Sequence, residues 1–211
     1  RLFDGHIIEG VLIPAKNRMT ACSSSQVVSS LSCKFCATGY LERKRNLLPA
    51  EIYDQVVRIG VLSQEYFNSP LTNVVFMGMG EPLLNYMNVL KAIDRITSPD
   101  GLGMSSKRIT LSTAGIAKMI KKLGDEQVKF NLALSLHAAN DEKRNRIMPI
   151  NETNSLDSLI EALDYFYQKT RSTITFEYIV FDQFNDSLQD AAELNKLARR
   201  IPAKVNLIEY N

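Results

Sequence analysis

The stretch CSSSQVVSSLSCKFCATG, residues 22–39, begins in a predicted strand and contains all three cysteines of the chain. Two of them, Cys33 and Cys36, have the spacing C-x-x-C. Ser29 stands four positions before Cys33, where a third cysteine would complete the pattern C-x-x-x-C-x-x-C. The stretch is therefore either an iron–sulfur site in which one ligand is replaced, or it is no metal site.

The spacing C-x-x-C is compatible with three kinds of site. A structural zinc site requires four ligands, and the sequence has no second C-x-x-C and no H-x-x-x-H pair. A redox pair of the thioredoxin type should open a helix. Closely spaced thiolates also suit an iron–sulfur cluster. The spacing alone leaves these alternatives open.

The composition is typical of one globular domain, with 211 residues, 45% hydrophobic and 23% charged. A net charge of +2 means that any nucleic-acid surface would have to be a local patch. One basic cluster does surround the cysteines, and a solvated face is its simpler interpretation. Its members are Lys16, Arg18, Lys34, Arg43, Lys44 and Arg45.

Cysteine usage indicates a reducing compartment. The chain has only three cysteines, it opens with no secretory leader, and no apolar run approaches the ~18 residues of a membrane span. We therefore expect a cytoplasmic protein. In the cytosol, paired cysteines bind metal or do chemistry more often than they form disulfides.

Short apolar runs alternate along the chain with longer segments of helical period. Strands are expected over residues 6–13, 18–27, 72–78, 107–112, 129–137, 173–181 and 203–211. Helices are expected over residues 49–67, 85–96, 115–124, 141–147, 155–169 and 187–200. About six strand-then-helix units result. They predict a parallel α/β sheet with helical crossovers, either open and doubly wound or a full or partial barrel.

In such folds chemistry gathers where the strands end. Three of these ends have small or polar residues: GMGEP at 78–82, LSTAG at 111–115 and SLHA at 135–138. Each also has a structural interpretation. The glycines suit a turn, the Ser-Thr pair suits a helix cap, and a single strand-end histidine is more often a satisfied structural residue than a ligand.

These segments stand in a recognisable order and spacing. Together they resemble the radical S-adenosylmethionine adenosine-C2 methyltransferases that act on 23S ribosomal RNA and certain tRNAs, and the resemblance covers nearly the whole chain. The matching segments are CSSSQV, CKFCATG, NVVFMGMGEPL, RITLSTAG, LALSLHAANDEKRNRIMPIN, FEYIVFDQFND and VNLIEYN.

The resemblance implies a partial (β/α)6 barrel that holds a 4Fe-4S cluster and S-adenosylmethionine. In that family an electron from the cluster cleaves the cofactor to a 5′-deoxyadenosyl radical. One cofactor methylates a cysteine near the C-terminus, and a second activates that methyl group for addition to C2 of adenosine. A disulfide then releases the product. An electron donor such as flavodoxin is implied, and we expect a monomer.

The resemblance also assigns roles to individual residues. The cluster ligands would be Cys33 and Cys36, with Ser29 at the third position. Cys22 would resolve the covalent RNA adduct, and Glu9 would lie near the substrate base. The cofactor contacts would be Gly80, Glu81, Ser112, Ser135, Leu136, His137 and Asn211. The RNA-phosphate contacts would be Arg43, Lys44 and Arg45.

Two features depart from the family pattern. Ser29 and Val28 replace a cysteine and a glycine, and a neutral hydroxyl is a poor iron ligand beside two thiolates. An engineered change, a paralogue that lost the chemistry, or an erroneous stretch of sequence would each explain this. No cysteine follows Cys36, so the methyl carrier is missing. We expect a single domain, residues 1–211, cut from a longer protein without its N-terminal accessory domain and C-terminal carrier region, and inactive as written.

Three rival functions remain at this point. The C8-methylating relative that confers antibiotic resistance shares the same motifs. A non-catalytic RNA-binding paralogue that lost the cluster is favoured by Ser29 and disfavoured by the intact cofactor motifs. A zinc-bound structural module is the third.

Overall fold

The computed structural model describes residues 1–28, 31, 33–36 and 44–210. Their contacts divide the chain into two compact units. The first consists of Arg1–Ser30 and Ala37–Ser112, and the second of Leu31–Cys36 and Thr113–Asn211. Among the described helices, none combines the length and the apolar character that crossing a bilayer requires.

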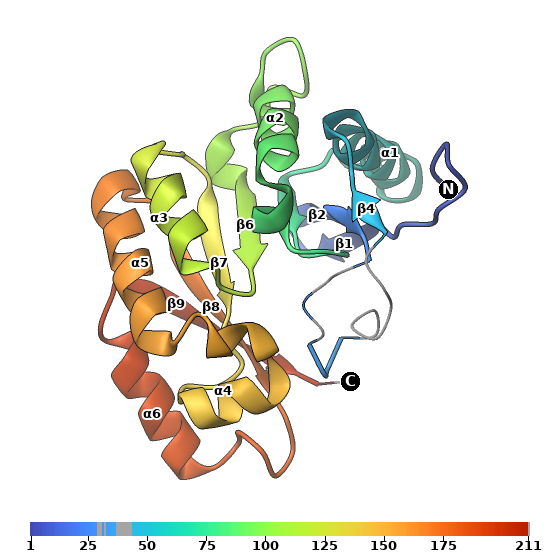
Figure 1. Ribbon diagram of the computed structural model, residues 1–211. Coiled ribbons are helices and arrows are strands. Elements are labelled where there is room, and N and C mark those ends of the chain that lie inside the picture. Colours follow the sequence, from blue (N-terminus) through green and yellow to red (C-terminus); the bar gives the residue numbers. More distant parts are fainter. Residues whose placement is uncertain (29–30, 32, 37–43, 211) are drawn as a thin grey trace. The chain divides into compact units, whose positions relative to one another are not determined.

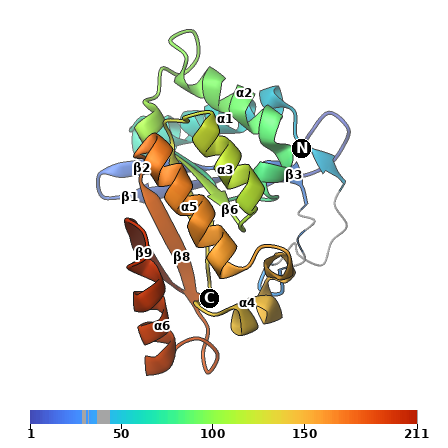
Figure 2. The same cartoon turned by 60° about the vertical axis from the view of Figure 1, so that its left-hand side comes forward.

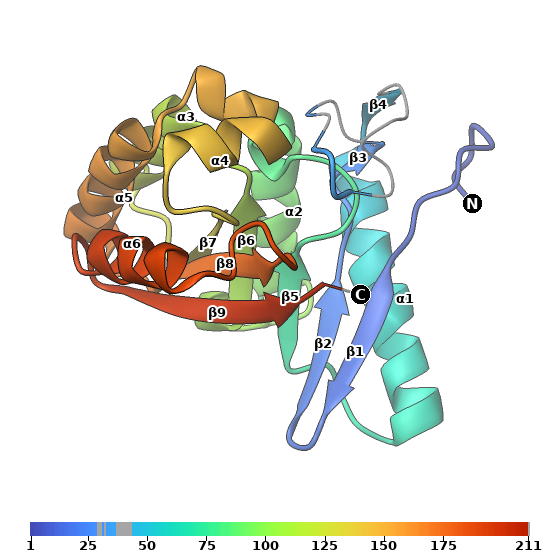
Figure 3. The same cartoon turned by 90° about the horizontal axis from the view of Figure 1, so that it is seen from below.

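The first unit is built on a mostly parallel sheet (Figure 3). An antiparallel hairpin of β1 (Val11–Ala15) and β2 (Arg18–Cys22) opens it, and β2 then pairs in parallel with β5 (Asn73–Phe76). β6 (Ile109–Thr113) pairs in parallel with β5. A separate two-stranded ladder joins β3 (Gln26–Val27) to β4 (Arg45–Asn46).

The strand expected over residues 6–13 is wrong in its bounds, because β1 begins at Val11 and ends at Ala15. Ala15 pairs with Arg18, which leaves a two-residue turn at Lys16-Asn17. This tight turn fixes the register of the hairpin, and imperfect apolar alternation before Val11 could not reveal it. The strand expected over residues 18–27 is likewise split between β2 and β3.

Two helices of the first unit lie side by side, α1 (Pro49–Phe67) and α2 (Tyr86–Thr97) (Figure 1). Pro49 occupies the first turn of α1. The structure also shows that the Leu48 N–H donates to the Glu51 carboxylate at 2.8 Å. Short 3-10 helices cover Pro82–Asn85 and Ser106–Arg108. The helices bury one face each against the sheet; core residues include Ala21, Ile52, Val56, Val74, Phe76, Val89, Ile93 and Ile109.

The second unit contains three parallel strands (Figure 3). They are β7 (Asn131–Ser135), β8 (Ile174–Val180) and β9 (Ala203–Glu209), paired in that order. The register sets Ser135 opposite Glu177 and Glu177 opposite Asn206.

Four helices complete the second unit: α3 (Ala117–Asp125), α4 (Asp141–Ile147), α5 (Leu156–Thr170) and α6 (Leu188–Ala198). A 3-10 helix covers Pro149–Glu152. Helices α3 and α5 pack together (Figure 2). Their approach is close, because a Cβ at Gly124 would lie 3.2 Å from the Tyr165 ring. The core includes Ile120, Leu123, Leu132, Leu134, Leu159, Leu163, Phe166, Ile174 and Phe176.

Candidate functional site

The predicted site residues fall in both units, and each unit is described by itself. The first unit contains Glu9, Cys22, Lys44, Arg45, Gly80, Glu81 and Ser112. The second contains Cys33, Cys36, Ser135, Leu136 and His137. Three predicted residues, Ser29, Arg43 and Asn211, lie outside the described residues.

In the first unit, the buried polar segment Ser23–Gln26 runs against the loop Met77–Glu81 that follows β5. The Met79 carbonyl accepts the N–H groups of Ser25 and Gln26, at 2.8 and 3.1 Å. The Gly78 N–H donates to the Ser23 carbonyl at 3.1 Å. All four residues of Ser23–Gln26 are buried, so these hydrogen bonds are shielded from water.

Two glycines make this close approach possible. A Cβ at Gly78 would lie 2.7 Å from the Ser24 Oγ, and a Cβ at Gly80 would lie 2.5 Å from the Gln26 Cβ. Gly80 also has φ +97°, in the left-handed region that favours glycine. The glycines of GMGEP are therefore required by packing within the chain, whatever ligand the loop binds.

Glu81 ends this loop and is 3% exposed. Its backbone N–H donates to the Gln26 Oε1 at 2.9 Å, and its carboxylate accepts the Leu83 N–H at 3.0 Å. The carboxylate therefore caps the 3-10 helix that follows. Ser112 is also buried and lies one residue before the end of β6.

Cys22 and Glu9 have different environments. Cys22 ends β2, its side chain is half-buried, and burial raises the pKa of its thiol. Glu9 is exposed, while its backbone carbonyl accepts a hydrogen bond from the Ser24 Oγ at 2.6 Å. The Glu9 backbone is thus anchored to Ser23–Gln26, while its side chain faces solvent.

Arg45 has internal partners. Its guanidinium donates to both carboxylate oxygens of Glu51 at 2.8 Å and to the Asp4 carboxylate at 2.6 Å, and it lies over the Phe3 ring. The Arg45 guanidinium lowers the pKa of both carboxyls. Arg45 therefore ties the N-terminal segment to α1, and its contact with RNA stays a prediction, as does that of Lys44.

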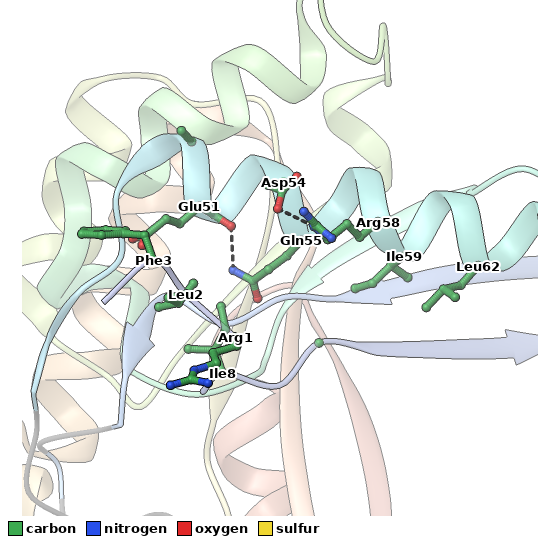
Figure 4. Close-up of a pocket in the computed structure, with 12 residues that line it drawn as sticks. Arg1, Leu2, Phe3, Ile8, Glu51, Asp54, Gln55, Arg58, Ile59 and Leu62 are labelled. Carbon is green, nitrogen blue, oxygen red and sulfur yellow. Dashed lines mark hydrogen bonds and ion pairs between the residues drawn. The ribbon is translucent and has the colours of Figure 1, made fainter. Parts of the chain in front are cut away.

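The first unit also has a cavity of about 540 Å³ between its N-terminal segment and α1 (Figure 4). Leu2, Phe3 and Ile8 face Gln55 and Ile59 across it. Among the described residues that line this cavity, none belongs to the predicted site. Cavity size therefore does not identify the predicted site here.

The second unit holds the C-x-x-C segment as a turn. The Cys36 N–H donates to the Cys33 carbonyl at 3.2 Å, and both cysteine side chains are half-buried. The Lys34 N–H donates to the Ile147 carbonyl at the end of α4, at 3.0 Å. The Phe35 ring meets the His137 ring edge-on, with centroids 4.8 Å apart. The turn is therefore held by a backbone hydrogen bond to the end of α4 and by a ring contact with His137.

His137 follows β7 with φ +56° and is buried. Its Nδ1 accepts the Ile179 N–H at 3.1 Å, and its carbonyl accepts the Asn185 Nδ2 at 2.7 Å. Burial, and secondarily the charge of Arg144, lowers the pKa of His137 to about 3. The imidazole is neutral at physiological pH, and it acts as an acceptor through Nδ1.

Arg144 of α4 is fully buried, and sequence reasoning missed it. Its guanidinium donates to the carbonyls of Leu136, Ser135 and Ala114 at 3.0, 3.0 and 2.6 Å. A fourth hydrogen bond of 2.5 Å reaches the Asn151 Oδ1. Among the described residues it forms no ion pair, and burial lowers the pKa of Arg144 to about 10. It therefore stays charged and holds the end of β7 in place.

The described residues fit S-adenosylmethionine better than they fit a complete cluster. A carboxylate and several serine hydroxyls suit a ligand with an amine and ribose hydroxyls. For the cluster, Cys33 and Cys36 supply two thiolates and the third position is a serine. Among the described residues, no group of three or more His, Cys, Asp or Glu side chains is arranged to hold a metal ion. The residues present do not complete a three-thiolate set.

Comparison with known proteins gives a consistent result. The family model of the radical SAM superfamily matches residues 26–194. A protein named probable dual-specificity RNA methyltransferase RlmN, from Cytophaga hutchinsonii, is 68% identical over 100% of this chain and 58% of its own length. Its namesake from Salinibacter ruber is 49% identical over 98% of this chain and 58% of its own length. The chain thus spans about three-fifths of these relatives.

Solved structures with a similar fold include members of the same superfamily. A radical SAM methyltransferase from Sphaerobacter thermophilus matches with a TM-score of 0.96 and 39% identity, covering 100% of this chain and 62% of that one. Archaeal TYW1 matches with a TM-score of 0.57 and 14% identity, covering 86% of this chain and 61% of that one, which shows the fold alone. The expected α/β fold, a partial (β/α)6 barrel with outer helices, is confirmed.

Gly80→Ala should lower the free energy of unfolding by about 2–4 kcal/mol, because the new methyl group meets Gln26 and the backbone is held at positive φ. Gly103→Ala is the matched control: Gly103 has φ +59°, but nothing lies within 4 Å of its Cβ position. It should cost only about 1 kcal/mol. If urea denaturation shows that the two variants lose the same free energy of unfolding, the collision with Gln26 does not destabilise Gly80→Ala and the packing argument is wrong.

His137→Asn should make stability less sensitive to acid. The folded pKa lies below the ordinary 6.5, so this stabilisation is complete above pH 6.5 and is lost as pH falls toward 3. Between pH 7 and pH 5 the unchanged protein should lose about 2 kcal/mol more than the variant in urea denaturation. Carboxylates are common to both proteins, so identical losses would mean that His137 is not buried in its neutral form.

Arg144→Met should lower the free energy of unfolding by about 3–5 kcal/mol, because three carbonyls and one amide oxygen lose their donors. Arg146→Met changes an exposed arginine of the same helix and should cost less than about 1 kcal/mol. Chemical denaturation measures the free energy of unfolding of both variants. If Arg144→Met loses no more of it than Arg146→Met, the buried guanidinium does not stabilise the fold as described.

Proposed function

We propose that this chain, which belongs to the radical SAM superfamily, is the catalytic core of an RNA methyltransferase. The reaction would add a methyl group to C2 of a specific adenosine in 23S ribosomal RNA and in some tRNAs. The observation that supports this most directly is the 68% identity, over the whole chain, to a protein named probable dual-specificity RNA methyltransferase RlmN.

Cys33 and Cys36 would hold iron of a 4Fe-4S cluster, which in this superfamily supplies the electron for cofactor cleavage. Their turn is suited to this, since two half-buried thiols lie on one short, fastened segment. Ser29 leaves the ligand set incomplete. We therefore infer that this chain, as given, does not sustain turnover.

The remaining residues would bind the cofactor and the RNA. Glu81 would accept hydrogen bonds from the methionine amine of S-adenosylmethionine, since a buried, fixed carboxylate suits an ammonium group. Further cofactor contacts would come from Gly80, Ser112, Ser135, Leu136, His137 and Asn211. The neutral His137 would offer no charge repulsion to the sulfonium of the cofactor.

Cys22 and Glu9 would act on the RNA substrate. Burial raises the pKa of the Cys22 thiol, so this cysteine stays protonated and unreactive at neutral pH until a base removes its proton. This suits a residue that resolves a covalent adduct only after methyl transfer. Glu9 has an exposed side chain on an anchored backbone, as a group that meets the substrate base requires.

The partners follow from this function. They would be 23S ribosomal RNA, tRNA and an electron donor such as flavodoxin, in the cytoplasm, with the protein as a monomer. Arg43, Lys44 and Arg45 would contact RNA phosphates. The C8-methylating relative shares the motifs of the proposed site, so C2 is proposed from the resemblance to the adenosine-C2 methyltransferases.

A second candidate function is a non-catalytic RNA-binding protein, which Ser29 favours. Against it stands the intact set of cofactor motifs, Gly80-Glu81, Ser112 and Ser135–His137. A protein that binds only RNA has no need to keep these contacts.

Anaerobic iron–sulfur reconstitution tests the proposal, with iron and sulfide counting and EPR on this chain and on Ser29→Cys. We expect only Ser29→Cys to assemble a reducible cluster that cleaves S-adenosylmethionine, because it restores the third thiolate. Adding Cys33→Ala to Ser29→Cys should abolish the cluster. If Ser29→Cys is folded and holds no iron, the enzyme proposal fails and the RNA-binding alternative replaces it.

A further inference from the structure

Gln26 is a fully buried amide at the centre of the first unit. Its Oε1 accepts the Glu81 N–H at 2.9 Å, and its Nε2 donates to the Asn46 Oδ1 at 2.7 Å. Its backbone N–H donates to the Met79 carbonyl at 3.1 Å. Both ends of the amide are therefore satisfied, and its orientation is fixed by the β3–β4 ladder in which Gln26 faces Asn46.

The hydrogen bond to Glu81 holds the peptide that directly follows Gly80. Glycine visits positive and negative φ at similar cost, so the Gly80–Glu81 peptide plane has little preference of its own. The Gln26 side chain packs where a Gly80 Cβ would be, and its Oε1 holds the N–H of that same peptide. Gln26 thus prevents the plane from turning, which would redirect the Glu81 side chain.

We propose that Gln26 is a positioning residue that aims the Glu81 carboxylate at the amine of S-adenosylmethionine. The inference rests on the proposed function, in which Glu81 binds that amine. Gln26 touches the backbone of Glu81 on one side, and the Leu83 N–H holds the carboxylate on the other. Together these two hydrogen bonds restrict the orientation of Glu81.

Gln55 provides a matched comparison. It is also a buried glutamine, and it also braces Ser23–Gln26, since its Oε1 accepts the Ser24 N–H at 2.9 Å and its Nε2 donates to the Ser24 carbonyl at 3.2 Å. Within the part of the chain that the structure describes, the side chain of Gln55 hydrogen-bonds to Ser24 and to the Glu51 carbonyl, and not to Gly78–Glu81. A purely structural role for the two glutamines predicts the same effect on ligand binding from either one.

The test compares two ligands by isothermal titration calorimetry. S-adenosylmethionine has the amino-acid group. 5′-Methylthioadenosine shares its adenosine and its S-methyl group but lacks the amino-acid group, and its sulfur is a neutral thioether in place of the sulfonium. The proteins are the Ser29→Cys chain, loaded with iron and sulfide under anaerobic conditions, and the same chain with Gln26→Met or Gln55→Met. Methionine keeps the length of glutamine and removes its hydrogen bonds.

Gln26→Met should weaken S-adenosylmethionine binding about tenfold and 5′-methylthioadenosine binding by less than about twofold, because only the first ligand uses Glu81. Gln55→Met should leave the ratio of the two affinities unchanged, even if it lowers the melting temperature of the protein as much as Gln26→Met does.

Two outcomes overturn the inference for different reasons. If the parent protein binds S-adenosylmethionine and Gln26→Met weakens both ligands equally, or neither, Gln26 is merely structural and the proposed function stands. If the folded parent protein does not bind S-adenosylmethionine, the proposed function fails, and the role of Glu81 and Gln26 fails with it.

Discussion

The strands of this chain end in buried surroundings, where backbone N–H and C=O groups no longer have a neighbouring strand as partner. Each such group must find another partner, because leaving it unpaired away from water is costly. In the first unit the side-chain oxygens of Gln26 and Gln55 accept such backbone N–H groups. In the second unit the side chains of Arg144 and Asn185 donate to such carbonyls. These side chains decide the course of the loops that contain the proposed site residues.

Much of the fold was predictable because its signals are local. Pro49 in a first turn and the apolar period of residues 49–67 predicted α1 to the residue. Short apolar runs such as TNVVFMG correctly indicated buried strands. The resemblance to radical S-adenosylmethionine RNA methyltransferases is also confirmed, because it rests on motifs spread over the whole chain. The hairpin of β1 and β2 was misplaced, since a tight turn and not apolar alternation sets its register.

The buried polar residues of the site were not predictable, for a physical reason. DEKRNRI has the composition of a solvated helix, and nothing in it marks Arg144 as the one arginine that points inward. Gln26 stands in a run of serines that resembles a loop. The sequence indicates only that the glycines of GMGEP suit a turn, and it does not show that a side chain there would collide with Ser24 or Gln26. Such roles depend on contacts between segments far apart in the sequence.

The C-x-x-C turn is fastened by Ile147, His137 and Phe181, all of which lie far downstream in the chain. A ribosome therefore releases Cys33 and Cys36 long before the residues that hold them exist. Until then the two thiols are part of an unfolded segment, open to oxidants and to disulfide formation with each other. If the turn binds a cluster as we propose, metal loading would follow synthesis of the second unit, and reducing conditions would protect the nascent chain during that interval.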